Sequence, residues 1–348
     1  MTAPLPLSDD VVGEARHGSY CPKMCTFACP VAEATGRDDA VPWSFHHTVV
    51  SLAEERITPE QAANGLRACS GCMGCQQPCD VDQDVPAQIR AGRAAVDFTA
   101  GTSAAVLDRL REGRRPDGTT PIPAEVVTGA PILLVGCHDD PDTVAAARAL
   151  MQAAAGGPVG VVAAPGCCGQ LASDLGAPDV AAERATALGA AVPTGVVVAL
   201  DPHCLDATRA ALPDADVRDL WTHLEAHRDQ LSFAGDPMSV TYHDPCLLAR
   251  PEGVVSAPRT LLADAGVTVV EPEFHGAATA CSGAGMGLPD VDPDAAAATA
   301  TRRAGQLQAT GVPAATACTR ARTQITAADA DTLDLAQLLS RRLAETGS

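Results

Sequence analysis

Four cysteines between residues 69 and 79 constrain this chain more than any other feature. They follow the spacing C-x2-C-x2-C-x3-C, as Cys69, Cys72, Cys75 and Cys79. Three thiolates two residues apart can wrap one cubane iron–sulfur cluster, whereas the fourth points away toward a second cluster. Zinc and disulfide bonds are the alternatives, but four thiols packed this closely favour a cluster. The spacing therefore predicts ligands for two iron–sulfur clusters.

A second cysteine run lies upstream, as Cys21-Pro-Lys-Met-Cys25-Thr-Phe-Ala-Cys29-Pro30. The last cysteine of such a run binds the other cluster, so Cys29 is expected to exchange partners with Cys79. The predicted ligand sets are Cys29, Cys69, Cys72 and Cys75 (set one, a [4Fe–4S] cluster) and Cys21, Cys25 and Cys79 (set two). Three thiolates suit a [3Fe–4S] cluster, or a [4Fe–4S] cluster with one non-cysteine ligand. An open iron site and an ordinary electron relay are both possible roles for set two, and the relay is favoured.

The rest of the composition describes a large and acidic chain. Its 348 residues suffice for two or three domains with cores of their own. The net charge of −19 repels nucleic acid and anionic membrane surfaces. The first 20 residues lack the pattern of a secretion signal, and no apolar run reaches the roughly 18 residues of a membrane span. We expect a cytoplasmic protein with reduced thiols, no membrane span and no nucleic-acid partner.

The segment that holds sets one and two, residues 21–99, is expected to be helical and to follow a lead-in over residues 1–20. Helices are predicted over residues 44–56 and after Pro86. Another helix is predicted to begin at Thr58, where Thr58 and Gln61 have the spacing of a capping box. Residues 100–130 carry one short helix followed by a linker containing Pro and Gly.

From Pro131 onward, apolar strand candidates alternate with Ala-rich helices. The candidates are ILLVGC, VGVVAAPGCCG and GVVVALDPHC, then VTYHDPC, TVVEPEF and VPAATAC. Such alternation predicts an α/β fold with a largely parallel sheet. Most candidates end at or near a cysteine, and open α/β sheets place their sites at the carboxyl ends of strands.

The cysteines of this region repeat. Cys168 lies 36 positions before Cys204, and Ser282 lies 36 positions before Cys318. Two modules, residues 131–235 and 236–348, are the simplest account of this repeat. Aligned in order, their residues are Cys137, Cys167, Cys168 and Cys204 in module one (set three) and Cys246, Cys281, Ser282 and Cys318 in module two. The three cysteines of module two, Cys246, Cys281 and Cys318, form set four.

Three motifs carry a resemblance to a known family: Cys167-Cys168-Gly169-Gln170, residues 242–246 (YHDPC) and residues 281–285 (CSGAG). They resemble the CCG cysteine-rich domain, present twice in heterodisulfide reductase catalytic subunits. The same pair occurs in the iron–sulfur subunits of glycolate, lactate and anaerobic glycerol-3-phosphate oxidoreductases. The upstream cysteine runs resemble the helical ferredoxin domain of those proteins. The resemblance implies a multidomain fold, with an N-terminal α-helical ferredoxin-like domain followed by two repeated α/β CCG modules.

The chain departs from this family at its sites. The full motif ends in C-x-x-C, whereas Ala207 and Ala321 stand at its last position here, and Ser282 replaces one cysteine. Set three keeps four thiols and is expected to hold a further iron–sulfur cluster. Set four keeps three and, with Ser282 or His243, could hold a cluster with an exposed iron or none. His243 is the candidate for catalytic proton handling, while His138 and His203 are expected to make local hydrogen bonds.

The sequence contains no convincing flavin or nicotinamide fingerprint. We therefore expect an iron–sulfur electron-transfer subunit of an oxidoreductase, served by a partner flavoprotein that oxidises a small organic acid or alcohol. The electrons would pass to quinone or another carrier. The alternatives are a heterodisulfide reductase-like enzyme that reduces a disulfide at the CCG modules, and a redox or iron sensor.

Overall fold

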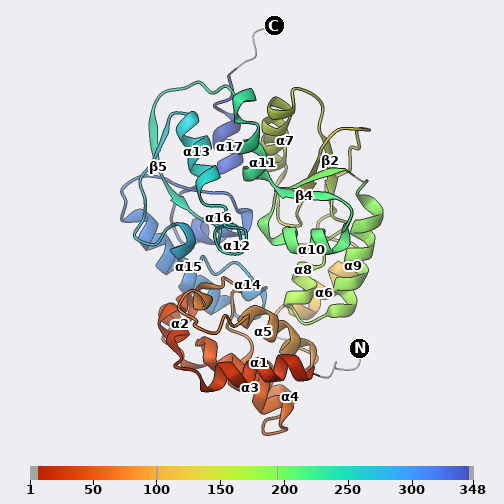
Figure 1. Cartoon of the computed structure of the whole chain (residues 1–348), viewed down its shortest axis with the longest axis vertical. Coiled ribbons are helices and arrows are strands. Elements are labelled where there is room, and N and C mark those ends of the chain that lie inside the picture. Colours follow the sequence, from red (N-terminus) through yellow and green to blue (C-terminus); the bar gives the residue numbers. More distant parts are fainter. Residues whose placement is uncertain (1–6, 99–100, 194, 345–348) are drawn as a thin grey trace.

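The chain forms two parallel sheets that lie side by side above a group of helices (Figure 1). The computed structural model describes residues 7–98, 101–193 and 195–344. Small parts of the predicted lead-in, linker and modules (residues 1–6, 99–100, 194 and 345–348) lie outside the described residues. The prediction of a multidomain α/β protein with parallel sheets is confirmed.

The helical part begins earlier than expected, because residues 9–20 of the predicted lead-in form a helix that packs on residues 42–53. The capping box is present in full, with Thr58 and Gln61 bonded to each other's backbone. None of the described helices has the length and apolar character needed to cross a membrane. The helices of this part are α1 (Asp9–Tyr20), α2 (Pro30–Thr35), α3 (Pro42–Ala53), α4 (Pro59–Gly65), α5 (Val85–Ala94) and α6 (Ser103–Arg111).

Module one is a four-stranded parallel sheet in the order β2-β1-β3-β4. Helices connect successive strands, so that all four strands run parallel, as the alternation of strands and helices predicts. The last strand was not predicted from the apolar pattern, because its residues, DVRD, are mostly polar and lie at the edge of the sheet. The elements are β1 (Ile132–Val135), α7 (Pro141–Ala155), β2 (Gly160–Ala163), α8 (Gln170–Asp174), α9 (Pro178–Ala191), β3 (Val196–Ala199), α10 (Leu205–Ala211), β4 (Asp216–Asp219) and α11 (Leu220–Ala226).

Module two repeats this topology in the order β6-β5-β7-β8. Its edge strand, TLD, is again too short and polar to be predicted from an apolar pattern. The elements are β5 (Met238–His243), α12 (Cys246–Ala249), α13 (Ser256–Asp264), β6 (Val267–Val269), α14 (Leu288–Val291), α15 (Pro293–Gln308), β7 (Ala314–Thr316), α16 (Thr319–Ala327), β8 (Thr332–Asp334) and α17 (Leu335–Ser340).

The strand order determines where a site can form. In both modules the chain leaves the first strand toward one edge and returns to the other side of that strand, so the order reverses between β1 and β3, and between β5 and β7. Neighbouring crossovers then diverge, and a crevice opens at the carboxyl ends of the two strands. Cys137 and Cys246 follow β1 and β5 at this position, and Cys318 follows β7.

One buried side chain ties the three parts together. Arg93 on α5 has no exposed surface and donates to four backbone carbonyls. Two of them, on Leu66 and Arg67, belong to the helical part at 3.0 and 3.1 Å. The others belong to Asp174 of module one at 2.6 Å and Met286 of module two at 2.9 Å. A guanidinium with its donors satisfied in this way holds three chain segments in register.

Replacing Arg93 with Met is expected to destabilise the protein by roughly 3–5 kcal/mol, because four carbonyls lose their donor and several stay buried. Denaturant unfolding of the anaerobically purified protein, followed by circular dichroism, measures the change. Arg341→Met is the matched control, since Arg341 is exposed and its side chain bonds to Gln337 one turn earlier in the same helix. Equal midpoints for the two variants would contradict the role given to Arg93.

Candidate functional site

The four thiols of set one meet in the helical part, around an apolar cavity. Cys29, Cys69, Cys72 and Cys75 line this cavity together with Val31, Pro42, Phe45 and Val85. The Gly71 N–H donates to Cys69 Sγ at 3.3 Å. Burial raises the pKa of Cys29 to about 12 and that of Cys69 to about 11. A cation, which replaces the thiol protons, is therefore needed to keep these sulfurs as thiolates.

The three thiols of set two lie close to set one. Burial, followed by the nearby sulfurs of Cys21 and Cys79, raises the pKa of the Cys25 thiol. Cys79 Sγ accepts the N–H of Gln83 at 3.5 Å. Cys25 also acts on the pKa of Cys75, which burial raises first. The structure thus groups Cys29 with the downstream run and Cys79 with the upstream run.

Set three forms a continuous row of buried sulfurs at the switch point of module one. Cys137 contacts Cys167, Cys167 contacts Cys168, and Cys168 contacts Cys204. Hydrogen bonds from the Cys137 and Cys168 thiols hold the pKa of Cys167 well below its usual range. The N–H of Gly169 adds a further hydrogen bond at 3.3 Å.

Set four lies at the equivalent position of module two, directly against set one. Cys246, Cys281 and Cys318 line a small cavity with His203 and His243. Cys281 hydrogen-bonds to Cys72, which lowers the pKa of Cys72 to about 5, and Cys281 Sγ lies 3.1 Å from Ser70 Oγ. Sets one and four are therefore in direct contact through these thiols.

The two modules share a local geometry around the cysteine pair. Gly169 and Gly283 both have positive φ, at +103° and +77°, and each N–H donates to the sulfur two residues earlier. A Cβ on either glycine would lie 2.7 or 2.6 Å from a helix carbonyl, that of Ala181 or Ala296. Only glycine fits, because both the backbone conformation and the helix contact exclude a side chain.

The strand register corrects the predicted alignment of Cys204 with Cys318. Ala199 of β3 pairs with Asp219, and Thr316 of β7 pairs with Asp334. Both aspartates cap the helix that follows, so Ala199 and Thr316 are equivalent. Asp201 lies two residues after Ala199, and Cys318 lies two residues after Thr316, so Asp201 is the counterpart of Cys318. Equal spacing misled the alignment because the cysteine stands at a different distance from the end of the strand in each module, five residues after Ala199 but two after Thr316.

By the same register, Cys204 of module one is equivalent to Ala321 of module two. Asp201 and Cys318 occupy the same capping position, where each side chain accepts a backbone N–H from the residue two or three positions on. Relative to the C-x-x-C pair of the family that the sequence resembles, module one has Asp201 at the first position and module two has Ala321 at the second.

In each module, the residue two positions after the capping residue (Asp201 or Cys318) extends its side chain toward the thiols of the other module. His203 of module one lies with its Nδ1 4.0 Å from Cys318 Sγ of module two. Arg320 of module two lies with its Nη2 3.7 Å from Cys137 Sγ of module one. Arg320 Nε is also 3.6 Å from Asp201 Oδ2. Sets three and four thus each have a side chain from the opposite module beside them, which the sequence repeat does not reveal.

His243 is fully buried, and its surroundings define its tautomer. Arg303 Nε donates to His243 Nδ1 at 3.0 Å, so the imidazole proton lies on Nε2. Burial and the Arg303 charge hold the pKa of His243 well below its usual range. His243 therefore presents an N–H donor to the cavity rather than a group that gains a proton near neutral pH.

The other two histidines differ from each other. His203 Nδ1 bonds to Asp201 Oδ1 at 3.0 Å, in the manner of a local hydrogen bond. His138 Nε2 is buried and has no partner among the described residues, and burial lowers the pKa of His138 to about 3.

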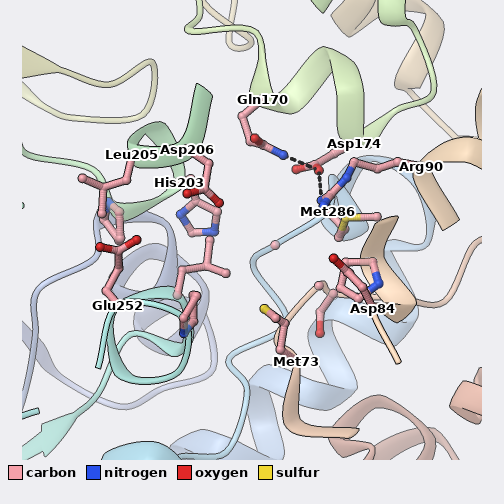
Figure 2. A pocket seen from close by; sticks show the side chains of 17 residues that line it. Met73, Asp84, Arg90, Gln170, Asp174, His203, Leu205, Asp206, Glu252 and Met286 are labelled. Carbon is pink, nitrogen blue, oxygen red and sulfur yellow. Dashed lines mark hydrogen bonds and ion pairs between the residues drawn. The ribbon is translucent and has the colours of Figure 1, made fainter. Parts of the chain in front are cut away.

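An open cleft leads from the surface to set four. It is formed where the three parts meet, and it shares Pro202, His203 and Gly285 with the cavity around set four. Figure 2 shows His203 and Glu252 on one side of this cleft, facing Arg90 across it. The Asp174 carboxylate is bonded to Arg90 at 3.2 Å and to Gln170 at 2.8 Å. The cleft is the route by which a small molecule could approach His203.

The residues present fit iron–sulfur clusters. All 14 cysteines are free thiols. They fall into the four sets described, and backbone N–H groups point at several sulfurs. Cations stand beside them: the buried Arg320 at set three, and the partly buried Arg250, which donates to the Cys72 carbonyl of set one. Anionic thiolate clusters need such donors and charges in a buried site.

Comparison with known proteins finds a family match within module two. The family model described as a cysteine-rich domain, CCG, matches residues 240–326. The chain therefore carries a CCG domain there, around Cys246, Cys281 and Cys318. It is also 34% identical over 109 residues to a "probable membrane-anchored ferredoxin" of Chromohalobacter salexigens. That alignment covers 28% of this chain and 16% of the relative, so the chain matches only a small part of the length of that protein.

Gly283→Ala is expected to destabilise the protein by about 2 kcal/mol or more, because the new methyl group meets the Ala296 carbonyl in a left-handed backbone. Gly305→Ala is the control, since a Cβ at this helical position meets nothing within 4 Å. It should leave stability unchanged or raise it by up to about 1 kcal/mol. Thermal unfolding compares the two, and a neutral Gly283→Ala would show that the turn tolerates a side chain.

Proposed function

We propose that this chain is an iron–sulfur protein that transfers electrons within an oxidoreductase system. The observation that carries the proposal is the spatial order of the four thiol sets. Set two neighbours set one through Cys25 and Cys75, and set one contacts set four through Cys72 and Cys281. Set four neighbours set three through Asp201 and Arg320. Clusters bound at these sets would accept and release single electrons.

The chain's own residues prepare this row of sites. They bury the sulfurs, exclude water from set three, and supply cations that compensate thiolate charge. Arg250 donates to the backbone carbonyl of Cys72 of set one at 2.5 Å and to that of Thr279, two residues before Cys281 of set four. Arg320 lies between sets four and three. The contact between sets one and four and the contact between sets four and three thus each have a guanidinium beside them, which favours the added negative charge of a reduced site.

We further propose that set two is the end of the row that meets a partner protein. The described residues include six exposed large hydrophobic side chains, and four of them surround this set: Tyr20, Met24, Phe27 and Val81. Tyr20 is 81% exposed and Phe27 84% exposed. Exposed aromatic side chains grouped in this way are typical of interaction sites. Asp80 and Asp82 flank Val81 and are exposed, which favours a partner with a basic rim.

A flavoprotein that oxidises a small organic acid or alcohol is the partner we propose, with quinone or another carrier as acceptor. Two-electron chemistry on an organic substrate must be done elsewhere if this chain carries single electrons. The similarity of one segment to a ferredoxin and the CCG domain support the electron-transfer part. We place the protein in the cytoplasm, where thiols stay reduced.

Reduction of a disulfide at set four is the second candidate. The cleft supports it, because it brings a small molecule to His203 and Gly285, which also line the cavity of set four. Anaerobic assay of small organic disulfides with a chemical reductant tests this activity. Equal rates for Cys318→Ala and the wild type would exclude it.

Single alanine variants test whether Cys29 binds the cluster of the downstream cysteine run and Cys79 that of the upstream run. Cys29→Ala and Cys72→Ala are expected to lose the same EPR signal, because both thiols line the cavity of set one. Cys25→Ala, the near neighbour in sequence, should instead lose the signal that Cys79→Ala loses. Iron and sulfide analysis of anaerobically purified protein should fall by one cluster in each. A Cys29→Ala protein that matches Cys79→Ala would contradict the assignment.

The partner surface is tested by a double substitution, Tyr20→Ser with Phe27→Ser. Loss of two exposed aromatic anchors is expected to weaken partner binding tenfold or more, which corresponds to about 1.4 kcal/mol. The readout is flavin that copurifies with the tagged protein, relative to its iron content. Phe274→Ser is the matched control, because Phe274 is 37% exposed but lies on module two. Equal flavin loss in both variants, or none in either, would argue against this surface.

A further inference from the structure

The loop of set one packs closely on the loop of module two that carries the second thiol of set four. A Cβ on Gly285 would lie 2.2 Å from the backbone oxygen of Ser70, so only glycine allows this approach. Arg250 joins the same two loops, because it donates at 2.5 Å to the carbonyls of Cys72 and Thr279. Backbone packing and a shared cation therefore fix the position of Ser70 relative to module two.

The hydroxyl of Ser70 lies between the two thiol sets. Its Oγ is 3.1 Å from Cys281 Sγ of set four, and it also hydrogen-bonds to Cys72 of set one. Ser70 is 4% exposed, so water competes little for this hydroxyl. One buried side chain thus contacts a sulfur of each set, and it does so from the loop between Cys69 and Cys72.

The direction of these hydrogen bonds depends on the state of the sulfurs. A thiol can donate its S–H to Ser70 Oγ, whereas a thiolate that binds a metal can only accept. When both sulfurs bind metal, the O–H of Ser70 is therefore the donor toward Cys72 and toward Cys281. A hydroxyl carries one proton, so it can donate to only one of the two sulfurs at a time.

We propose that the Ser70 hydroxyl is a shared hydrogen-bond donor that couples the centres at sets one and four. This inference rests on the proposed function, since it concerns two of the iron–sulfur sites assigned there. Ser70 donates to Cys72 while the added electron is at set one. When that electron moves to set four, the hydroxyl turns about its Cβ–Oγ bond and donates to Cys281. Set one is then oxidised and set four reduced by one electron, and Ser70 keeps its proton throughout.

Module one shows that this contact belongs to the boundary between the two sets. Cys167, the counterpart of Cys281, contacts the two neighbouring thiols of its own module. Cys281 instead contacts Ser70 and Cys72, which belong to the helical part. In both modules a glycine N–H also donates to the sulfur. The serine contact is therefore an addition to the repeated fold, made only where set four meets set one.

Sharing one donor links the reduction potentials of the two centres. A hydrogen bond to sulfur stabilises the more negative, reduced state of a cluster and thereby raises its reduction potential. Because Ser70 has a single proton, the donor that favours reduction of one centre is withdrawn from the other. The pair then accepts one electron more readily than two, which favours passing an electron on over storing a second one.

The test compares wild type, Ser70→Ala and Ser70→Thr as anaerobically purified full-length proteins. Redox titration followed by EPR gives the two potentials, and the signals are assigned as those removed by Cys29→Ala (set one) and Cys318→Ala (set four). Ser70→Ala should shift both potentials to lower values, because both centres lose a donor to their reduced state. Ser70→Thr keeps a hydroxyl and should stay near the wild-type values.

Ser19→Ala is the matched control for the loss of a buried hydroxyl. Ser19 is also buried in the helical part, but its Oγ donates to the carbonyl of Ala15 at 2.9 Å. This variant should leave the potentials of sets one and four unchanged. An equal shift in Ser19→Ala and Ser70→Ala would overturn the proposal, since it would reflect a general loosening of the helical part.

Iron and sulfide analysis of each variant separates the role of the hydroxyl from a role in folding. A cluster that is lost in Ser70→Ala and restored in Ser70→Thr still requires the hydroxyl, whereas a loss in both variants overturns the proposal. An unchanged potential at either set one or set four in Ser70→Ala also overturns it, because the donor is then not shared. A wild type without iron–sulfur signals would contradict the proposed function as well, whereas unchanged potentials contradict the shared donor alone.

Discussion

The arrangement of this protein depends on a single buried guanidinium. Arg93 donates to carbonyls of the helical part, of module one and of module two, and all of these contacts are removed from water. Burial lowers the pKa of Arg93 to about 10, which leaves it charged at neutral pH. The segments it joins are those that bring Cys72 against Cys281. Leu66 and Met286 each lie within six residues of one of these two cysteines, so Arg93 ties together the segments that carry sets one and four.

A second constraint arises between the two modules. Their equivalent residues His203 and Arg320 each cross into the opposite thiol set. Two copies of one fold, packed with their switch points facing each other, can exchange side chains in this way because the same loop of each copy lies at the interface. The crossing residue differs between the two modules. The cation Arg320 lies beside the four-thiol set, and the imidazole of His203 lies beside the three-thiol set.

Much of the site could be predicted from local spacing. The grouping of Cys29 with Cys69 follows from the rule for paired cysteine runs, and the structure places these thiols around one cavity. The alternation of strands and helices also predicts the two parallel sheets. The alignment of Cys204 with Cys318 was wrong, since equal spacing in sequence does not establish an equal position relative to the strands. The strands β4 and β8 were missed because edge strands need little apolar surface.

The sequence by itself determined the residue types and spacings that favour clusters, together with the fold class that places them at strand ends. These are local properties, since they depend on backbone geometry over a few residues and on hydrophobic periodicity. Only the tertiary structure decided which sets are neighbours, which tautomer His243 adopts, and that His203 of module one lines the cavity of set four. Those outcomes depend on residues such as Arg303 and His203, more than 50 positions from the groups they serve. No local pattern encodes such contacts, because they arise only when packed domains exclude water between them.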